Sequence, residues 1–227
     1  MDWRYNTIWF EQIADTNIFH CNYKDKLFSK NKFEDVEYAM TYYYKYKEFA
    51  FDQLPSSDKL LYLDMSLANI KDFSGIGKFK NLKRLEVHYC TKLESEFNIS
   101  SIKNTLEFLH INQSKKYTPT AELLKLKNLR VLCLNACGPI KDLKFLKHFP
   151  NLIDFRFVDT NVLDGDLTPI IDHPTIRTVG FLNKRHYNLT EKKIEEALKL
   201  KSTTEYKDFA YKGEFLTYKY KTLTADT

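Results

Sequence analysis

The chain has 227 residues, with 35 Lys and Arg against 30 Asp and Glu, a formal net charge of +5. This length suits one sizeable domain and is short for two, and so small a positive charge is not by itself a nucleic-acid-binding signature. No apolar run is long enough for a signal peptide or a transmembrane span, so we expect a cytoplasmic protein with no membrane partner. The four cysteines form no CxxC pair, which predicts free thiols in a reducing compartment: Cys21, Cys90, Cys133 and Cys137.

The amino-terminal third of the chain carries many aromatic residues without a clear period. Residues 1–37 are predicted to form an irregular amino-terminal cap, because a stack of repeats exposes an apolar end that atypical terminal units must cover. Residues 38–59, which include a run of tyrosines from Tyr42 to Tyr46, match a repeat only loosely. We interpret them as a degenerate first repeat.

Residues 60–183 contain an internal repeat of 22 to 24 residues. The most regular copy spans residues 127–137, where Leu129, Leu132, Leu134 and Cys137 fit the pattern L-x-x-L-x-L-x-x-N/C. Each copy is predicted to form a short strand followed by a turn and a return segment. The copies begin at these residues: Leu60, Leu82, Leu106, Leu129, Leu152 and Ile176.

The carboxy-terminal residues 184–227 break the repeat and show two other patterns. A helix is predicted from Thr190, which can cap it, with Ile194 and Leu198 on one face. A β-hairpin is predicted over residues 205–222, because aromatic residues alternate with polar ones on both sides of Lys212-Gly213. We interpret helix and hairpin together as a carboxy-terminal cap.

Residues 60–183 resemble a leucine-rich repeat protein of the short, irregular bacterial type. The resemblance implies a single α/β domain, a solenoid whose parallel strands line a concave sheet. It also implies a non-enzymatic module that binds another protein through that face, without a cofactor. Some small proteins of this kind act as immunity partners of bacterial toxins, so an intracellular inhibitor of a toxin is the concrete function that the resemblance favours.

Residues between the buried leucines should face outward from the concave sheet, because side chains alternate along a strand. They mix aromatic, acidic, basic and amide groups, a composition that suits a protein interface. We predict that the partner-binding residues are Tyr62, Asp64, Arg84, Glu86, His88, Phe108, His110, Asn112, Asp154 and Arg156.

Three other groups of residues have compositions that are compatible with other functions. Glu86, His110 and Cys133 lie on successive strands and have the composition of a cysteine-hydrolase triad, but an open sheet provides no evident oxyanion hole. His88 and His110 alone are too few for a metal site, so no metal is predicted. Lysines on the outer face could bind nucleic acid, but no aromatic residues interleave with them, which favours a solvated surface. These lysines are Lys71, Lys78, Lys80, Lys125, Lys127, Lys141, Lys144 and Lys147.

Overall fold

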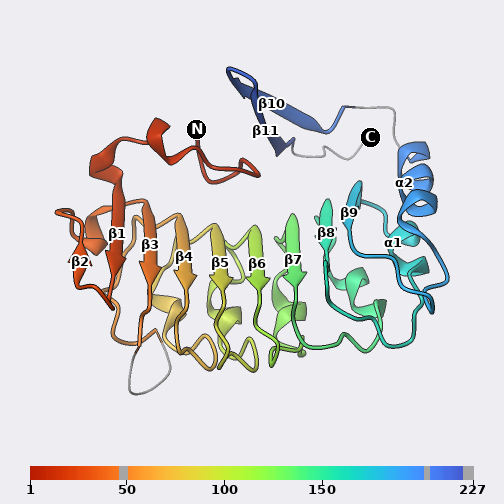
Figure 1. The fold of residues 1–227 in the computed structure, drawn as a ribbon, viewed down its shortest axis with the longest axis horizontal. Coiled ribbons are helices and arrows are strands. Elements are labelled where there is room, and N and C mark those ends of the chain that lie inside the picture. Colours follow the sequence, from red (N-terminus) through yellow and green to blue (C-terminus); the bar gives the residue numbers. More distant parts are fainter. Residues whose placement is uncertain (46–50, 202–204, 222–227) are drawn as a thin grey trace.

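A nine-stranded sheet runs the length of the molecule in the computed structural model, which describes residues 1–45, 51–201 and 205–221. The strand order is β2-β1-β3-β4-β5-β6-β7-β8-β9 (Figure 1), and all neighbours are parallel except the β1–β2 pair. The predicted parallel concave sheet is therefore confirmed. Its strands are β1 (Ile18–Asn22), β2 (Leu27–Phe28), β3 (Tyr38–Tyr42), β4 (Tyr62–Ser66), β5 (Arg84–His88), β6 (Phe108–Asn112), β7 (Val131–Asn135), β8 (Asp154–Arg156) and β9 (Thr178–Gly180).

The repeats stack in register, so equivalent residues form straight columns across the sheet. Glu86 of β5 pairs with His110 of β6, which pairs with Cys133 of β7. Alternation sends every second side chain into the interior. The inward residues of the central strands are fully buried in one continuous core: Leu63, Met65, Leu85, Val87, Leu109, Ile111, Leu132 and Leu134.

The return segments on the outer side are single turns. Most are 3-10 helices, η4 (Ile76–Lys78), η5 (Ile99–Ile102), η6 (Leu123–Lys125) and η7 (Lys144–His148), and the last is the short α-helix α1 (Thr168–Asp172). A single turn suffices because a repeat of this length leaves few residues to carry the chain back to the next strand.

A row of left-handed residues marks the carboxyl ends of β3 to β7. Tyr43, Leu67, Tyr89, Gln113 and Ala136 have φ between 47° and 58°, although none is glycine. Each donates its N–H to a carbonyl of the neighbouring repeat over 2.8 to 3.0 Å, which extends the ladder by one rung. This conformation costs roughly 1–2 kcal/mol for such residues. The regular hydrogen bonds offset that cost and hold a row of side chains at this edge of the sheet.

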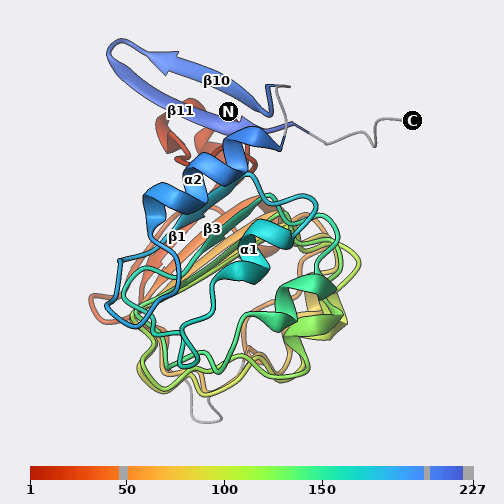
Figure 2. The ribbon, with the colours of Figure 1, turned by 90° about the vertical axis from the view of Figure 1, so that its right-hand side faces the viewer.

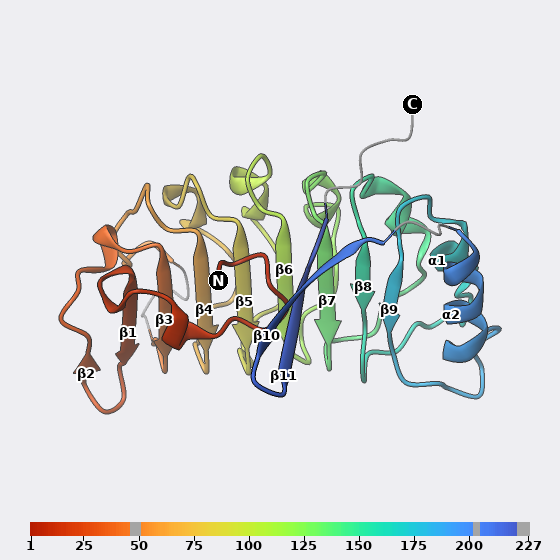
Figure 3. The same ribbon diagram turned by 90° about the horizontal axis from the view of Figure 1, so that it is seen from above.

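The amino-terminal residues contribute more to the sheet than a cap alone. β1 pairs with β3 in parallel and in register, and β2 closes the open edge of β1 as an antiparallel strand. Phe19 and Phe33 are buried at this end of the core. Residues 1–13, by contrast, leave the end of the stack and run along the concave side (Figure 3).

The carboxy-terminal helix and hairpin are both present as predicted. Helix α2 (Glu191–Leu200) begins at Thr190, whose side chain accepts a hydrogen bond from the N–H of Lys193. The helix covers the β9 end of the stack (Figure 2), and its Ile194 and Leu198 are buried in the core. The hairpin consists of β10 (Lys207–Lys212) and β11 (Phe215–Tyr220). It lies over the concave face instead of the end of the stack, because its aromatic side chains find partners there (Figure 3). Tyr46 and residue 222, the last of the predicted hairpin, lie outside the described residues.

Within the ranges that the structure describes, no helix combines the length and the apolar character needed to cross a membrane. The four cysteines are free and buried.

Candidate protein-binding site on the concave face

The two ends of the chain join each other above the sheet. We call residues 1–13 together with β10 and β11 the strap. Asn6 donates its N–H to the carbonyl of Tyr218 over 2.7 Å, and Thr7 donates to the hydroxyl of Thr217 over 3.0 Å. Tyr5 forms an antiparallel bridge with Lys219. The amino-terminal segment therefore lies beside β11 much as a third strand would, and the strap spans the middle of the sheet (Figures 1 and 3).

Arg84 fastens the strap to the centre of the sheet. Its guanidinium donates to the carbonyls of Trp3 over 3.0 Å, Tyr5 over 2.5 Å and Asn6 over 3.1 Å. The same group lies 3.8 Å from the ring centroid of Phe108, within cation–π range. Guanidinium is suited to this position because it presents five donors in a fixed plane. Arg84 thus binds the protein's own backbone.

Tyr220 provides the second anchor, over β7 and β8. Its hydroxyl donates to Oδ2 of Asp154 over 2.5 Å, and its ring packs in a cluster with Phe108, Val131, Cys133 and Ile153. Burial and the Asp154 charge both raise the pKa of Tyr220, so the phenol stays protonated and donates. Asp154 is completely buried. The hairpin therefore fills a socket in the concave face.

Arginines beside this socket strengthen the same contact. Arg156 donates to the hydroxyl of Tyr218 over 2.9 Å while it pairs with Asp154 over 2.8 Å. Arg130 donates to the carbonyls of Tyr220 over 2.8 Å and Lys221 over 2.5 Å. Charge-assisted bonds of this kind are about twice as strong as neutral ones. They favour a strap that stays closed over this part of the sheet.

The strap divides the predicted binding residues into two groups. Tyr62, Arg84, Phe108 and Asp154 are 4%, 5%, 6% and 0% exposed beneath it. These residues lie at the amino ends of their strands and contact the chain itself, so they offer little surface to a partner. Glu86 is also buried, at 8% exposure. The remaining predicted residues are partly exposed: Asp64, His88, His110, Asn112 and Arg156.

The carboxyl ends of the strands remain open beside the strap. We call this surface the open strip. It includes two residues that sequence reasoning missed, Leu67 and Tyr89, which belong to the left-handed row just beyond the strands and are 37% and 52% exposed. The strip consists of Leu67, His88, Tyr89, His110, Asn112, Asn135, Val158 and Leu182.

A buried carboxylate organises the polar centre of the strip. Oε1 of Glu86 accepts a hydrogen bond from Arg84 over 2.5 Å, while Oε2 lies 3.0 Å from Nε2 of His88 and 3.8 Å from Nδ1 of His110. The two imidazole rings meet edge to face with centroids 4.9 Å apart. Asn135 contacts Nε2 of His110 over 3.1 Å. The structure thus brings together three predicted residues, Glu86, His88 and His110, in one hydrogen-bonded group.

The charges in this group follow from burial and from its cations. Burial opposes ionisation of Glu86, but Arg84 and the two histidines outweigh that effect and hold the pKa of the carboxyl well below its usual value. Burial also favours a neutral His88, yet the hydrogen bond to Glu86 prevails and raises its pKa. Burial dominates at His110 and lowers its pKa. The resting arrangement is therefore an ionised carboxylate held by an arginine and two imidazoles.

Cys133 has no part in this group. Its side chain packs with Tyr220, and burial and the Asp154 charge raise the pKa of the thiol well above its usual value. Among the described residues, no hydrogen bond joins Cys133 to His110, whose Nε2 contacts Asn135 instead. A nucleophilic cysteine needs a lowered pKa and a base within reach. This geometry does not support the hydrolase hypothesis.

The thiol chemistry provides a prediction. In the folded protein we expect Cys133 to react with Ellman's reagent at least about tenfold more slowly than free glutathione at neutral pH, because a buried thiol with a raised pKa forms little thiolate. The difference in reaction between wild type and Cys133→Ala gives the contribution of Cys133. In denaturant all four thiols should react. Reaction of Cys133 as fast as glutathione in the folded state would revive the triad.

The lysines of the outer face are interspersed with acidic groups. Lys71 lies 3.6 Å from Glu94, and Lys80 lies 3.9 Å from Asp58. Lys78 instead donates to the carbonyls of Asp52 and Leu54 over 2.6 and 2.9 Å. Such pairing is typical of a solvated surface and provides no observation in favour of nucleic-acid binding.

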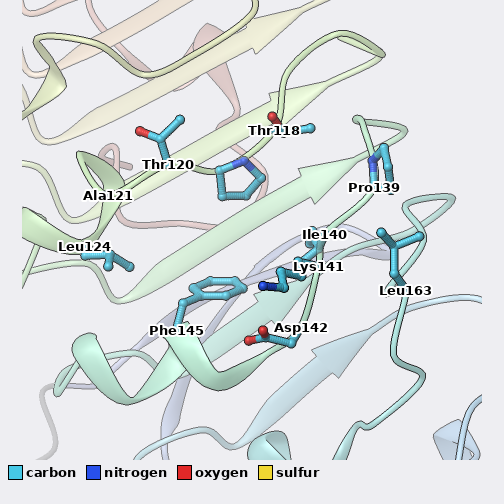
Figure 4. Close-up of a pocket in the computed structure, with 11 residues that line it drawn as sticks. Thr118, Thr120, Ala121, Leu124, Pro139, Ile140, Lys141, Asp142, Phe145 and Leu163 are labelled. Carbon is cyan, nitrogen blue, oxygen red and sulfur yellow. The ribbon is translucent and has the colours of Figure 1, made fainter.

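A pocket of about 500 Å³ lies on the outer side, between the turns that follow β6, β7 and β8 (Figure 4). Its walls are mainly apolar, with Leu124, Phe145 and Leu163 among them, and its charged residues are Lys141 and Asp142. Its lining contains no histidine or cysteine and none of the predicted site residues. The pocket is therefore separate from the concave surface.

Parallel strands that recur every 22 to 24 residues with a buried leucine row define a leucine-rich repeat solenoid. No family model and no curated protein matches the chain. A search of solved structures finds similarity to internalin C2 from Listeria monocytogenes, with 18% sequence identity and a TM-score of 0.43. The match covers 66% of this chain and 72% of that one.

Proposed function

We propose that this protein is a non-enzymatic binding module that holds another protein against the open strip. The observation that carries the proposal is the presence of exposed apolar side chains on either side of the polar Glu86 group, on a surface that the described residues leave uncovered. Tyr89 and Leu182 are more than half exposed, and Leu67 and Val158 are each 37% exposed. Apolar and aromatic anchors with polar neighbours are typical of protein interfaces.

The rigidity of this surface supports the same function. Six of the eight strip residues, all except Val158 and Leu182, lie on a strand or on the left-handed residue after it, where the backbone is hydrogen-bonded to the next repeat. The strap adds a second layer across the sheet. A surface already held in its binding conformation loses little entropy when a partner docks, so more of the contact energy appears as affinity.

We further propose that binding inhibits the partner, as an immunity protein inhibits a bacterial toxin. A rigid solenoid can cover a functional surface of its partner without supplying chemistry of its own. The four free, buried cysteines agree with the reducing cytoplasm in which such an inhibitor would act. This finer role is supported by the resemblance of the repeats to short bacterial leucine-rich repeat proteins, some of which act as immunity partners of toxins.

The binding surface is tested by quantitative affinity capture from the organism that encodes the chain. A strip variant combines Leu67→Ser with Tyr89→Ala, and a matched control combines Phe97→Ala with Leu163→Ala, which are 59% and 55% exposed away from the strip. We expect a partner that wild type and control retain equally and that the strip variant loses at least about tenfold, since a central anchor contributes 2 kcal/mol or more. Equal retention by the strip variant would contradict the proposal.

Phe108 and Asp154 are unsuitable for this experiment because they hold the strap. Their replacement would disturb the fold as well as any interface. Once a partner is identified, its activity measured with and without the protein tests the inhibitory role. Full activity in a saturated complex would contradict inhibition while leaving the binding surface intact.

A further inference from the structure

Three potential metal ligands converge on the open strip from two neighbouring strands. Glu86 and His88 come from β5 and His110 from β6, and one donor atom of each lies within 4.8 Å of the others. Oε2 of Glu86 is 3.0 Å from Nε2 of His88 and 3.8 Å from Nδ1 of His110. Donors bound tetrahedrally to zinc at 2.0–2.1 Å are about 3.3 Å apart. One of these separations is shorter and the other longer than that distance, so small side-chain shifts bring the donors to it.

We propose that Glu86, His88 and His110 bind a divalent transition-metal ion of the zinc class. Two imidazoles and one carboxylate are the donors that zinc accepts in sites with an open position, whereas magnesium and calcium prefer oxygen alone. The side chains of His88 and His110 are 17% and 20% exposed, so the fourth position faces solvent. Water or a donor from a docked protein can occupy it. The site does not depend on the proposed partner.

The surrounding residues hold these donors in place. Arg84 occupies Oε1 of Glu86 and leaves Oε2 directed at the histidines. Nδ2 of Asn112 lies 3.4 Å from Nδ1 of His88. Rotating that amide by 180° turns its oxygen to the ring, where it accepts an Nδ1 proton and leaves Nε2 for the ion. Outer partners of this kind fix the orientation of metal-binding imidazoles, and their loss commonly costs 10–100-fold in metal affinity. The charge of Arg84 works against the bound cation, which keeps the site weaker than a site without an adjacent arginine.

Asn135 determines which nitrogen of His110 carries the proton. Its Oδ1 accepts the N–H of Val158 over 3.0 Å, so its amide nitrogen donates to Nε2 of His110. The proton of the neutral ring therefore lies on Nδ1, facing Glu86. A metal ion at Nδ1 displaces that proton to solvent, and Nε2 takes up a proton from solvent. The amide N–H of Asn135 then faces the N–H at Nε2 of His110, and this contact between two donors opposes metal binding. An aspartate at position 135 would instead accept a hydrogen bond from that Nε2–H.

The experiment is a titration of the purified full-length protein with Co²⁺, followed by its visible absorption, and with Zn²⁺ in competition with a chromophoric chelator. We expect one equivalent to bind, at least about tenfold weakening in His88→Ala and in His110→Ala, and about 10–100-fold tightening in Asn135→Asp. His20→Ala is the control, because His20 is exposed on β1 outside this group. It should bind like wild type.

Circular dichroism establishes that each variant is folded. If an alanine variant does not fold, Glu86→Gln provides the same test, since it keeps the shape of the side chain and removes the anionic ligand. Absence of one-to-one binding at about 100 µM free metal would overturn the proposal. Unchanged affinity in both histidine variants would also overturn it, because the metal would then bind elsewhere. Failure of the capture experiment would leave this result unaffected, since no partner is present in the titration.

Discussion

Replacing Arg84 by alanine should lower the free energy of unfolding by about 3–5 kcal/mol, the usual result when one partner of a buried ion pair is removed. The substitution abolishes three hydrogen bonds to strap carbonyls and leaves Glu86, 8% exposed, without its arginine. Urea denaturation followed by circular dichroism measures the change. The same variant should weaken the attachment of residues 1–13 to the sheet, which amide hydrogen exchange would detect as faster exchange in that segment.

The matched control is Lys83→Ala, one residue earlier in the same repeat. Lys83 pairs with Glu107 over 3.1 Å, but both side chains are partly exposed, and such pairs contribute about 0–1 kcal/mol. If Arg84→Ala proved no more destabilising than Lys83→Ala, Arg84 would not be the anchor of the strap described above.

Phe157→Ala should also cost about 3–5 kcal/mol, since it removes a fully buried aromatic ring from the core. Phe157 is stacked between two other rings, with centroids 5.2 Å from Phe155 and 5.0 Å from Phe181. This stack closes the core near the last strands, where β8 and β9 have three residues each. Thermal or urea unfolding measures the loss.

Val158→Ala is the control for this substitution, because Val158 follows Phe157 in the chain and is 37% exposed on the concave side. Surface changes of this size usually fall within about 0.5 kcal/mol. A similar, small loss for both variants would mean that the aromatic stack is not a tightly packed part of the core.

The sheet is predictable from the sequence because the residues that specify each strand are close together in the chain and the same pattern recurs in every repeat. Each copy places leucines two residues apart on a strand, and stacking successive copies can bury that row in one way only. The pattern predicts Glu86, His110 and Cys133 on successive strands, and their backbones do pair in register. The helix after Thr190 is predictable for the same reason, since the residues of its cap and its apolar face lie within ten positions of one another.

The strap could not be predicted in the same way. Arg84 bonds to carbonyls 78 to 81 positions away, and Tyr220 reaches Asp154 across 66 positions. No periodicity encodes such contacts. The alternating tyrosines of the hairpin indicate a buried face but not what it covers, and an end cap is the simplest interpretation of that pattern. The left-handed row was missed because Tyr43, Leu67 and Tyr89 are not the glycine or asparagine that usually marks that conformation.

The predicted site changes accordingly. The amino-end column, with Tyr62, Arg84 and Phe108, serves the protein's own fold, and the surface open to a partner is displaced toward the carboxyl edge of the sheet. Cys133 lies at the boundary between the two, because its side chain packs with Tyr220 while its backbone pairs with that of His110. The concave face therefore combines an internal closure with the open strip that we propose as the binding surface.

Hydroxyl-radical footprinting of the folded protein tests this division of the concave face most directly. Tyr89 and Leu182 should be oxidised readily, whereas Tyr62, Phe108 and Tyr220 should be protected until the protein is unfolded in urea. Oxidation of Phe108 and Tyr62 at a rate close to that of Tyr89 in the native state would show that the strap does not cover the sheet, and would contradict the account.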